Sequence, residues 1–285
     1  MSKVYQIVTD RITKALESGT VPWRKTWASA GGLPENLLSH KKYRGVNCFL
    51  LSLMPYDRPY WLTYKQAQEL GGNVKKGEKS TPVVFWKQWE TKDKQTGEKT
   101  TIPVLRYYSA FNVAQCDGLK DKIPAPPKPR HDFTPIDRCE SIVSRYHGPT
   151  LRNGLSFRPC YKPALDVVEM PQPAYFDSPE TYYATLFHEL GHSTGHKSRL
   201  KRASIGDCDI HFGSSQYGRE ELVAEMSAAF LCAESGIDSP TLDNSAAYVA
   251  SWLKAIKQDV KLVATAAGQA QKAADLILDR FGGAK

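Results

Sequence analysis

The feature that most constrains the fold is the segment His188-Glu189-Leu190-Gly191-His192, which has the pattern H-E-x-x-H. On a helix the two histidines lie one turn apart on the same face, so both imidazoles can bind one divalent metal ion. Glu189 then lies beside them, where its carboxylate can act as the general base toward water. The alternative is a core helix that carries two histidines and a solvated glutamate. The pattern favours a helix with a metal site built into it.

Residues around the motif predict the helix that this metal site requires. Ser178 and Pro179 are typical of a helix start, because a serine oxygen can cap the first amides and proline fits the first helical position. Gly195 predicts the helix end. Between them, apolar residues at three- and four-residue spacing predict a buried face, formed by Tyr182, Tyr183, Leu186, Phe187 and Leu190.

A downstream segment, residues 217–232, supplies acidic candidates for a third metal ligand. It predicts a second helix, on which Glu221 and Glu225 lie one turn apart on one face. Two histidines and one glutamate leave a fourth coordination position open, as in catalytic zinc sites. We predict Glu221 as the ligand and Glu225 as the hydrogen-bond partner of a ligand histidine, although these roles could be exchanged. Glu220 is expected to be a solvated acid in the first helical turn.

Zinc is the expected metal, because two histidines and a carboxylate suit Zn²⁺, although Mn²⁺, Co²⁺ or Ni²⁺ could occupy the same ligands. His196 lies about 80° around a helix from His188, and it also follows Gly195. It is therefore expected to pack at the helix end rather than to bind the metal. The other histidines are isolated in the sequence and are expected to be ordinary surface or packed residues.

Charge is divided unevenly along the chain. Residues 1–130 contain 22 basic and 11 acidic residues, a net charge of +11. The whole chain has 38 basic and 30 acidic residues, which leaves 16 and 19 for the remainder, a net charge of −3. A basic half joined to a mildly acidic half indicates different partners for the two.

The sequence gives no indication of a membrane or of secretion. No run approaches the roughly 20 apolar residues of a membrane span, and the N-terminus does not resemble a signal peptide. The six cysteines are widely spaced and include no C-x-x-C pair. Reduced thiols in a cytoplasmic protein are therefore expected.

Five of the six tryptophans lie in the basic half, among interleaved aromatic and cationic residues. This combination is typical of proteins that bind single-stranded nucleic acid, because cations contact phosphates while aromatic faces stack on unpaired bases. No helix-turn-helix, zinc-finger or RNA-specific aromatic pattern is present. The alternative is that the tryptophans are core residues and the lysines form a solvated face. The predicted contact residues are Trp23, Arg24, Lys25, Trp27, Lys41, Lys42, Tyr43, Arg44, Lys75, Lys76 and Lys79.

A proline-rich run, Ile123–Arg130, divides the chain, and the predicted fold class is α+β. Residues 1–123 are expected to form a nucleic-acid-binding α+β domain. It would contain a first helix that ends near Gly19, a short helix capped by Thr63 and Gln66, and an antiparallel hairpin of residues 81–90 and 101–113.

Residues 124–134 are the predicted linker, and residues 135–285 are the predicted metal domain, which is mostly helical. This domain would contain a helix near residues 136–147, an extended segment around 150–170 and the two metal-site helices. Two alanine-rich helices, 245–265 and 268–281, would follow, with Gly268 between them. The two domains are expected to separate on limited proteolysis in the linker.

The sequence resembles the ArdC-type antirestriction proteins of conjugative plasmids along nearly its whole length. The resemblance is carried by Leu16–Trp23, Tyr43–Asn47, Trp61–Ala67, Gly72–Lys79, Phe111–Val113, His188–His196, Ser198–Leu200 and Arg219–Glu225. It implies a single-stranded-DNA-binding N-terminal domain, a zincin-like metallopeptidase domain, and protection of incoming plasmid DNA from host restriction.

Three functions stay open on the sequence alone. The favoured one is a single-stranded-DNA-binding antirestriction protein with a metal site. The second is a working zinc metalloprotease that cleaves a host protein, with the basic domain serving only for targeting. The third is a structural metal that stabilises a partner-binding domain. The expected partners are single-stranded DNA and a host restriction protein or another protein, without a membrane.

Overall fold

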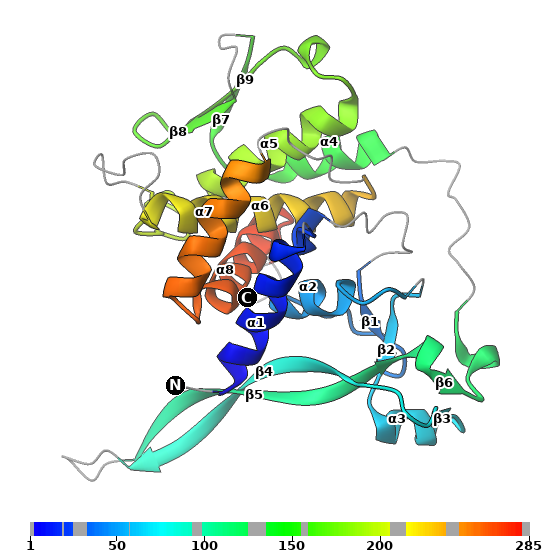
Figure 1. Ribbon diagram of the computed structural model, residues 1–285. Coiled ribbons are helices and arrows are strands. Elements are labelled where there is room, and N and C mark those ends of the chain that lie inside the picture. Colours follow the sequence, from blue (N-terminus) through cyan, green and yellow to red (C-terminus); the bar gives the residue numbers. More distant parts are fainter. Residues whose placement is uncertain are drawn as a thin grey trace.

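A computed structural model describes residues 3–18, 20–24, 33–56, 58–92, 99–124, 135–154, 159–205, 215–237 and 245–280. Figure 1 shows most helices gathered on one side and a long two-stranded ribbon extending beneath them. The fold is α+β, as the sequence predicts. Among the described helices, none is both long enough and apolar enough to cross a bilayer.

The N-terminal half combines short helices with two sheets. The larger sheet has the order β1-β2-β5-β4, with β1 and β2 parallel and the other pairs antiparallel; β3 and β6 form a second, antiparallel pair. Its elements are α1 (Lys3–Glu17), η1 (Pro22–Arg24), β1 (Glu35–Asn36), α2 (Val46–Ser52), β2 (Tyr60–Leu62), α3 (Tyr64–Glu69), β3 (Asn73–Val74), β4 (Thr81–Lys92), β5 (Lys99–Asn112), η2 (Val113–Gln115), β6 (Cys116–Asp117) and η3 (Lys120–Lys122).

Two predicted local structures of this half are confirmed. The capping box at the start of α3 is present, with Thr63 and Gln66 bonding each other's backbone amides. The hairpin is also present, and its pairing runs from Thr81 opposite Ala110 to Lys92 opposite Lys99. The ribbon therefore continues past the residues over which the hairpin was predicted.

The C-terminal half combines helices with a small sheet of order β7-β9-β8, which lies beside α5 at one end of the molecule (Figure 1). Its elements are α4 (Pro135–Arg145), β7 (Thr150–Asn153), β8 (Cys160–Lys162), β9 (Val167–Met170), η4 (Pro173–Tyr175), α5 (Pro179–Ser193), α6 (Ser215–Ser235), α7 (Ser245–Gln258) and α8 (Leu262–Ile277). The predicted start of α5 is confirmed, because the Ser178 side chain accepts a hydrogen bond from the Thr181 amide at 3.2 Å.

The predicted break between the last two helices was wrong. Gly268 lies inside α8, and the chain turns earlier, between α7 and α8. There the Asp259 side chain accepts a hydrogen bond from the Lys261 amide at 2.9 Å. The aspartate stabilises the turn by replacing a helical hydrogen bond, and Gly268 is tolerated within the helix.

The two halves of the chain share one hydrophobic core. The buried Trp23 ring packs edge-on against Phe49 and against Trp252, with ring centroids 5.9 Å and 5.3 Å apart. Phe49 in turn stacks on Phe230 at 5.0 Å. A hydrogen bond of 2.7 Å from the Thr9 hydroxyl to the Val260 carbonyl adds a polar contact between α1 and the turn that joins α7 to α8. The halves therefore stabilise each other, and the boundaries at residues 123 and 135 do not separate two independent cores.

Candidate metal centre and nucleic-acid surface

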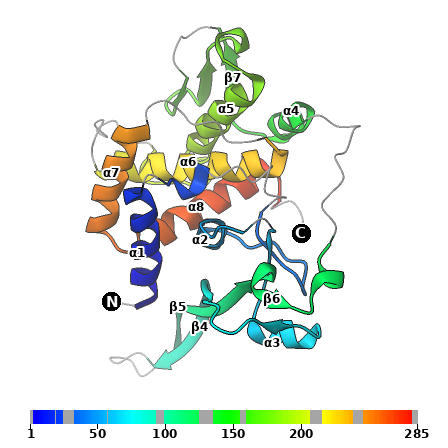
Figure 2. The ribbon, with the colours of Figure 1, turned by 45° about the vertical axis from the view of Figure 1, so that its right-hand side comes forward.

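The metal-site helices α5 and α6 pack against each other (Figure 2). A Cβ added at Gly191 would lie 3.2 Å from the Ala224 Cα and 3.3 Å from the Ala224 carbonyl oxygen. A side chain at this position would require α6 to shift by a few tenths of an ångström. Gly191 thus allows the close approach that brings the α6 glutamates next to the α5 histidines.

The three residues predicted as metal ligands meet at this contact. The Nε2 atoms of His188 and His192 lie 3.1 Å apart. The two carboxylate oxygens of Glu221 lie 3.4 Å from the His188 Nε2 and 3.5 Å from the His192 Nε2. Among the described residues, these three form the one group of histidine, cysteine and acidic side chains whose spacing suits a metal ion.

The donor atoms fit a divalent metal ion. Ligands about 2.0–2.1 Å from a tetrahedral zinc ion are separated from each other by about 3.3 Å. The two histidine nitrogens are close to this separation, and each of them has a different Glu221 oxygen at a similar distance. One donor atom from each of the three residues can be chosen so that all lie within 4.8 Å of one another. The Nε2 atoms are the nitrogens that face the shared space. Three protein ligands also leave a fourth position for water or substrate, which is the pattern of catalytic sites.

Glu225 and Glu221 occupy different places relative to His188. The Glu225 carboxylate faces the other ring nitrogen, Nδ1, at 4.0 Å. It therefore lies behind the imidazole rather than beside its Nε2 atom. Glu221, rather than Glu225, therefore faces the Nε2 atoms. The predicted hydrogen bond of Glu225 is not formed with His188, because 4.0 Å is too long and the buried His188 Nδ1 has no hydrogen-bond partner among the described residues.

The prediction for Glu220 was wrong. Its side chain is 5 % exposed, and its carboxylate lies 3.2 Å from the Nδ1 of His192. The helix begins at Ser215, so Glu220 lies beyond the first turn and under α5. By engaging Nδ1, Glu220 leaves the Nε2 of His192 available for a metal ion, which is the usual role of a carboxylate behind a metal-binding histidine.

Arg202 neutralises this buried glutamate. Its guanidinium donates to both Glu220 oxygens, at 2.9 and 2.5 Å, and to the Thr194 hydroxyl and the Gly191 carbonyl at 2.6 and 2.8 Å. Burial alone would raise the pKa of Glu220, but hydrogen bonds from His192 and Arg202 lower it to about 2. The carboxylate is therefore ionised at neutral pH.

The same contacts favour the protonated form of the His192 imidazole. Burial alone would lower the pKa of this imidazole, but hydrogen bonds with Glu220 and Glu221 raise it well above its ordinary value. The pKa of Glu221 is lowered, because its hydrogen bonds with the two histidines outweigh the effect of burial. A metal ion must displace the imidazole proton, so metal binding competes with acid.

Glu220→Gln is expected to weaken metal binding about 10- to 100-fold, because a neutral amide supports the His192 imidazole less well than a carboxylate. Isothermal titration with Zn²⁺ or Mn²⁺ measures the change. Glu180→Gln, which removes an acid from the first turn of α5, is the matched control. Equal metal affinities for the two variants would contradict this role of Glu220.

The remaining residues of the motif lie as the sequence predicts. Glu189 is buried on α5 directly after His188, and its charge contributes to the raised pKa of that histidine. The helix ends at Ser193, with Thr194 as its C-cap. His196 follows in a turn, where its Nδ1 lies 2.7 Å from the Ser198 hydroxyl, and it takes no part in the metal-site group.

Two of the aromatic residues predicted to contact nucleic acid are in the core. Trp23 is fully buried and Tyr43 is 8 % exposed, so neither ring can stack on a base. Lys25 and Trp27 lie outside the described residues, as does the Arg24 side chain. The other predicted cations lie at the surface: Lys41, Lys42, Arg44, Lys75, Lys76 and Lys79.

A different aromatic residue is exposed next to cations, on the β4–β5 ribbon. Trp89 is 46 % exposed, with the Lys87 Nζ 5.9 Å and the Arg106 Cζ 5.7 Å from its ring centroid. Phe85 lies four positions from Trp89 along the same strand, opposite Arg106, and is 41 % exposed. The sequence holds a signal for this face, because Phe85, Lys87 and Trp89 alternate along a strand and so point to one side.

Comparisons with known proteins agree with this architecture. Residues 2–111 match a family model described as the N-terminal domain of anti-restriction factor ArdC, and residues 138–269 match a zincin-like metallopeptidase model. The crystal structure of the antirestriction ArdC protein from the R388 plasmid, in its metal-free form, is 41 % identical with a TM-score of 0.81, and the match covers all of both chains. The chain belongs to the ArdC antirestriction family. The Mn(II)-bound structure of that R388 protein is 39 % identical with a TM-score of 0.79, again over both full chains.

Other relatives include two much longer proteins and one of similar length. It is 37 % identical to a DNA primase TraC of Escherichia coli over 96 % of its own length, but it spans only 27 % of that protein and 20 % of a second TraC. It is 36 % identical to the uncharacterized protein y4eC of Sinorhizobium fredii and covers 90 % of it. The two family matches leave residues 112–137 between them, a range that includes the predicted linker.

Proposed function

We propose that this ArdC-family protein binds single-stranded DNA and protects incoming plasmid DNA from host restriction during conjugation, in the cytoplasm of the cell. The observation that carries the proposal is Trp89 on the exposed ribbon, between Lys87 and Arg106. An aromatic face can stack on any unpaired base, while the flanking cations contact the phosphates on either side. The excess positive charge of residues 1–130 adds a sequence-independent attraction for a polyanion.

Trp89→Ala is expected to weaken binding of a single-stranded oligonucleotide by about 1–3 kcal/mol, the usual contribution of one stacked base. Arg106→Gln is expected to lower the slope of log affinity against log salt by about one. Fluorescence anisotropy of a labelled oligonucleotide measures both effects. The full chain is used, because the two halves share a core.

Tyr175→Ala is the matched control for Trp89→Ala, since Tyr175 is 66 % exposed and lies in the other half of the chain. The proposal fails if Trp89→Ala binds the oligonucleotide as tightly as Tyr175→Ala does. It also fails if the wild-type chain shows no salt-dependent binding.

We also propose that His188, His192 and Glu221 hold one divalent ion, with zinc as the expected metal. The spacing of their donor atoms supports this proposal, as does the manganese bound by the ArdC protein of R388. A divalent ion at such a site polarises a carbonyl group and lowers the pKa of water. Glu189 is buried next to His188, where its carboxylate can accept a proton from water.

This placement of Glu189, within a zincin-like domain, favours a second candidate function, the hydrolysis of a host protein. The basic ribbon would then serve to bring the protein to its target. In this reading the metal site acts on a peptide bond, whereas in the first reading DNA protection does not require cleavage. A structural metal is the third alternative.

Glu189→Gln is expected to retain metal and to lower any peptidase activity about 100-fold or more, because the general base is lost. Cleavage of fluorescein-labelled casein and metal titration are measured on the same samples, with Glu180→Gln as the control. Full protection of incoming DNA by Glu189→Gln would contradict a proteolytic mechanism. If chelation lowers the melting temperature but changes neither peptidase activity nor protection of incoming DNA, the metal has a structural role.

A further inference from the structure

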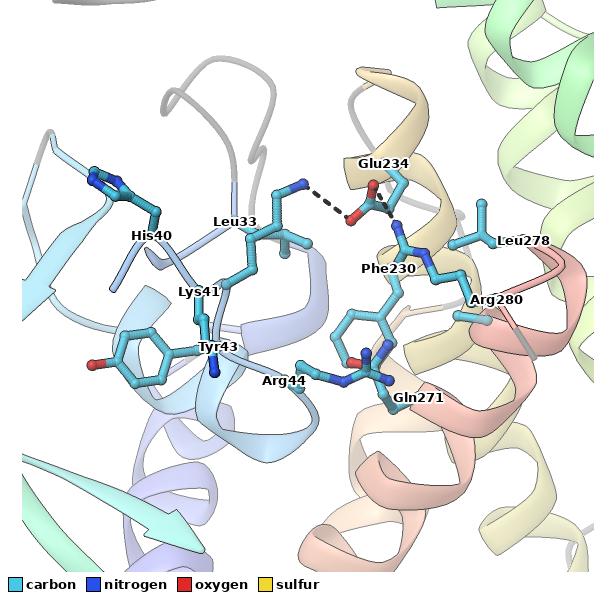
Figure 3. A pocket seen from close by; sticks show the side chains of 12 residues that line it. Leu33, His40, Lys41, Tyr43, Arg44, Phe230, Glu234, Gln271, Leu278 and Arg280 are labelled. Carbon is cyan, nitrogen blue, oxygen red and sulfur yellow. Dashed lines mark hydrogen bonds and ion pairs between the residues drawn. The ribbon is translucent and has the colours of Figure 1, made fainter. Parts of the chain in front are cut away.

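A cavity of about 530 Å³ lies between the two halves (Figure 3). It is at the opposite end of α6 from the metal site. Glu221 lies near the start of α6, whereas Glu234 lies at its end, roughly 20 Å away at 1.5 Å per residue. One wall is the segment of residues 40–44 and the other is formed by α6, α8 and Arg280. Neither the metal site nor the proposed DNA-binding face of the ribbon uses this cavity.

The cavity carries more positive than negative charge. Glu234 is paired with Lys42 at 3.3 Å and with Arg280 at 2.9 Å. Asp275, behind the cavity wall, is bound by Arg44 and lies 3.8 Å from Arg280. With Lys41, which forms no ion pair with any described residue, four cations face two carboxylates.

The position of these charges determines what they can bind. The side chains of Glu234 and Asp275 are only 8 % and 7 % exposed, whereas those of Lys42 and Arg44 are 52 % and 56 % exposed. The carboxylates are therefore covered, while the cationic groups reach solvent. An anion that enters the cavity therefore meets the cationic groups before the carboxylates. It can accept the hydrogen bonds that these groups otherwise donate to water.

The loop that carries Lys41 is ordered before any ligand arrives. The buried Asn36 side chain accepts hydrogen bonds from the Leu38 and Ser39 amides at 3.2 and 2.9 Å, and donates to Gln66 at 3.1 Å. His40 adopts a left-handed conformation with φ of 54°, which is costly for a residue other than glycine. An ordered loop loses less entropy when it binds a ligand.

The lining also has an apolar part, formed by Leu33, Phe230 and Leu278. These side chains suit a sugar or base better than a bare ion. We propose that the cavity binds a phosphate group carried on a nucleotide, with the phosphate on Lys41, Lys42, Arg44 and Arg280 and the rest of the nucleotide against the apolar wall. That the nucleotide belongs to single-stranded DNA rests on the proposed function.

Contacts between side chains connect the cavity with the ribbon. Tyr43, which lines the cavity, forms a hydrogen bond with Tyr108 of β5. Tyr108 packs against Phe85, with ring centroids 5.9 Å apart. Phe85 lies on the same side of β4 as Trp89. A continuous series of side-chain contacts therefore runs from the cavity to the ribbon face proposed to bind DNA.

The test uses the full chain with Lys41→Gln, Arg280→Gln and both together. Lys41 makes no ion pair with a described residue, and Arg280→Gln leaves Glu234 paired with Lys42 and Asp275 with Arg44, so the variants are expected to fold. Lys254→Gln and Arg138→Gln remove the same charges from exposed positions of α7 and α4 and serve as matched controls. Melting temperatures are compared first.

Isothermal titration with a deoxynucleoside 5′-monophosphate is the direct measurement. The double cavity variant is expected to bind it at least about tenfold more weakly than the double control, and the unphosphorylated nucleoside is expected to bind far more weakly to every chain. Equal monophosphate affinities for the two double variants overturn the proposal. Equal affinity of the wild type for inorganic phosphate and for the monophosphate overturns the role of the apolar wall.

Anisotropy with a single-stranded oligonucleotide separates this inference from the proposed function. In the double cavity variant, the slope of log affinity against log salt concentration is expected to be smaller by about two than in its control. Trp89→Ala is expected to weaken binding of the oligonucleotide but to leave the affinity for the monophosphate unchanged. Monophosphate binding without any oligonucleotide binding by the wild type would overturn the DNA assignment and keep the phosphate site. An unchanged slope together with normal oligonucleotide binding would overturn a DNA role for the cavity.

Discussion

Trp23→Ala is expected to lower the free energy of unfolding of the whole chain by about 3–5 kcal/mol, as buried tryptophans do when truncated. Trp23 is fully buried and packs edge-on against Phe49 of its own half and Trp252 of the other. Its removal leaves a cavity between the two halves, and the rings around it cannot collapse without moving α2 or α7. Equilibrium urea unfolding followed by circular dichroism measures the loss.

Trp86→Ala is the matched control, because Trp86 is 55 % exposed on the ribbon and buries much less surface in the core.

Unfolding of the wild type is expected to be a single transition for probes in either half. Cleavage within residues 124–134 is expected to leave two fragments that elute together on gel filtration. Fragments that separate and stay folded, or equal effects of the two tryptophan variants, would contradict the shared core.

Arg202→Met is expected to lower the free energy of unfolding by about 3–5 kcal/mol, the usual effect of removing one partner of a buried ion pair. The change leaves the Glu220 carboxylate buried without its arginine partner. It also removes hydrogen bonds to the Thr194 hydroxyl and the Gly191 carbonyl at the end of α5. Because Glu220 contacts His192, metal affinity is expected to fall in the same variant.

The double variant Arg202→Met, Glu220→Gln tests the cause. It removes both charges, so it is expected to recover a large part of the stability that Arg202→Met loses. Metal affinity is expected to stay at the level of Glu220→Gln alone, because the carboxylate behind His192 is absent in both. A double variant as unstable as the sum of the two single variants would show that Arg202 acts through its other hydrogen bonds.

Much of the metal centre could be predicted from the sequence because its signals are local. Ser178 and Pro179 determine where α5 begins, and the four-residue spacing of His188 and His192 places both rings on one face. The same spacing sets Glu221 and Glu225 on one face of α6. The capping box of α3 and the β4–β5 hairpin were also confirmed, since each depends on residues close in the chain.

Local periodicity identifies the face of a helix or strand that a residue occupies, but not what covers that face. Glu220 looked solvated from its position on α6, yet Arg202 and His192 enclose it because α5 packs across the helix at Gly191. Trp23 and Tyr43 lie among cations in the sequence, yet both are buried. Trp23 packs against Trp252 from the other half of the chain.

The sequence by itself therefore determined most of the helices, the ribbon and the candidate ligands of the metal, but not where α7 ends and α8 begins. Only the tertiary structure decided which aromatic residues are exposed, which carboxylate supports His192, and that the two halves share one core. The physical reason is that burial depends on contacts between residues far apart in the chain, such as Trp23 with Trp252 and Arg44 with Asp275. Those contacts form only when the helices of both halves pack together.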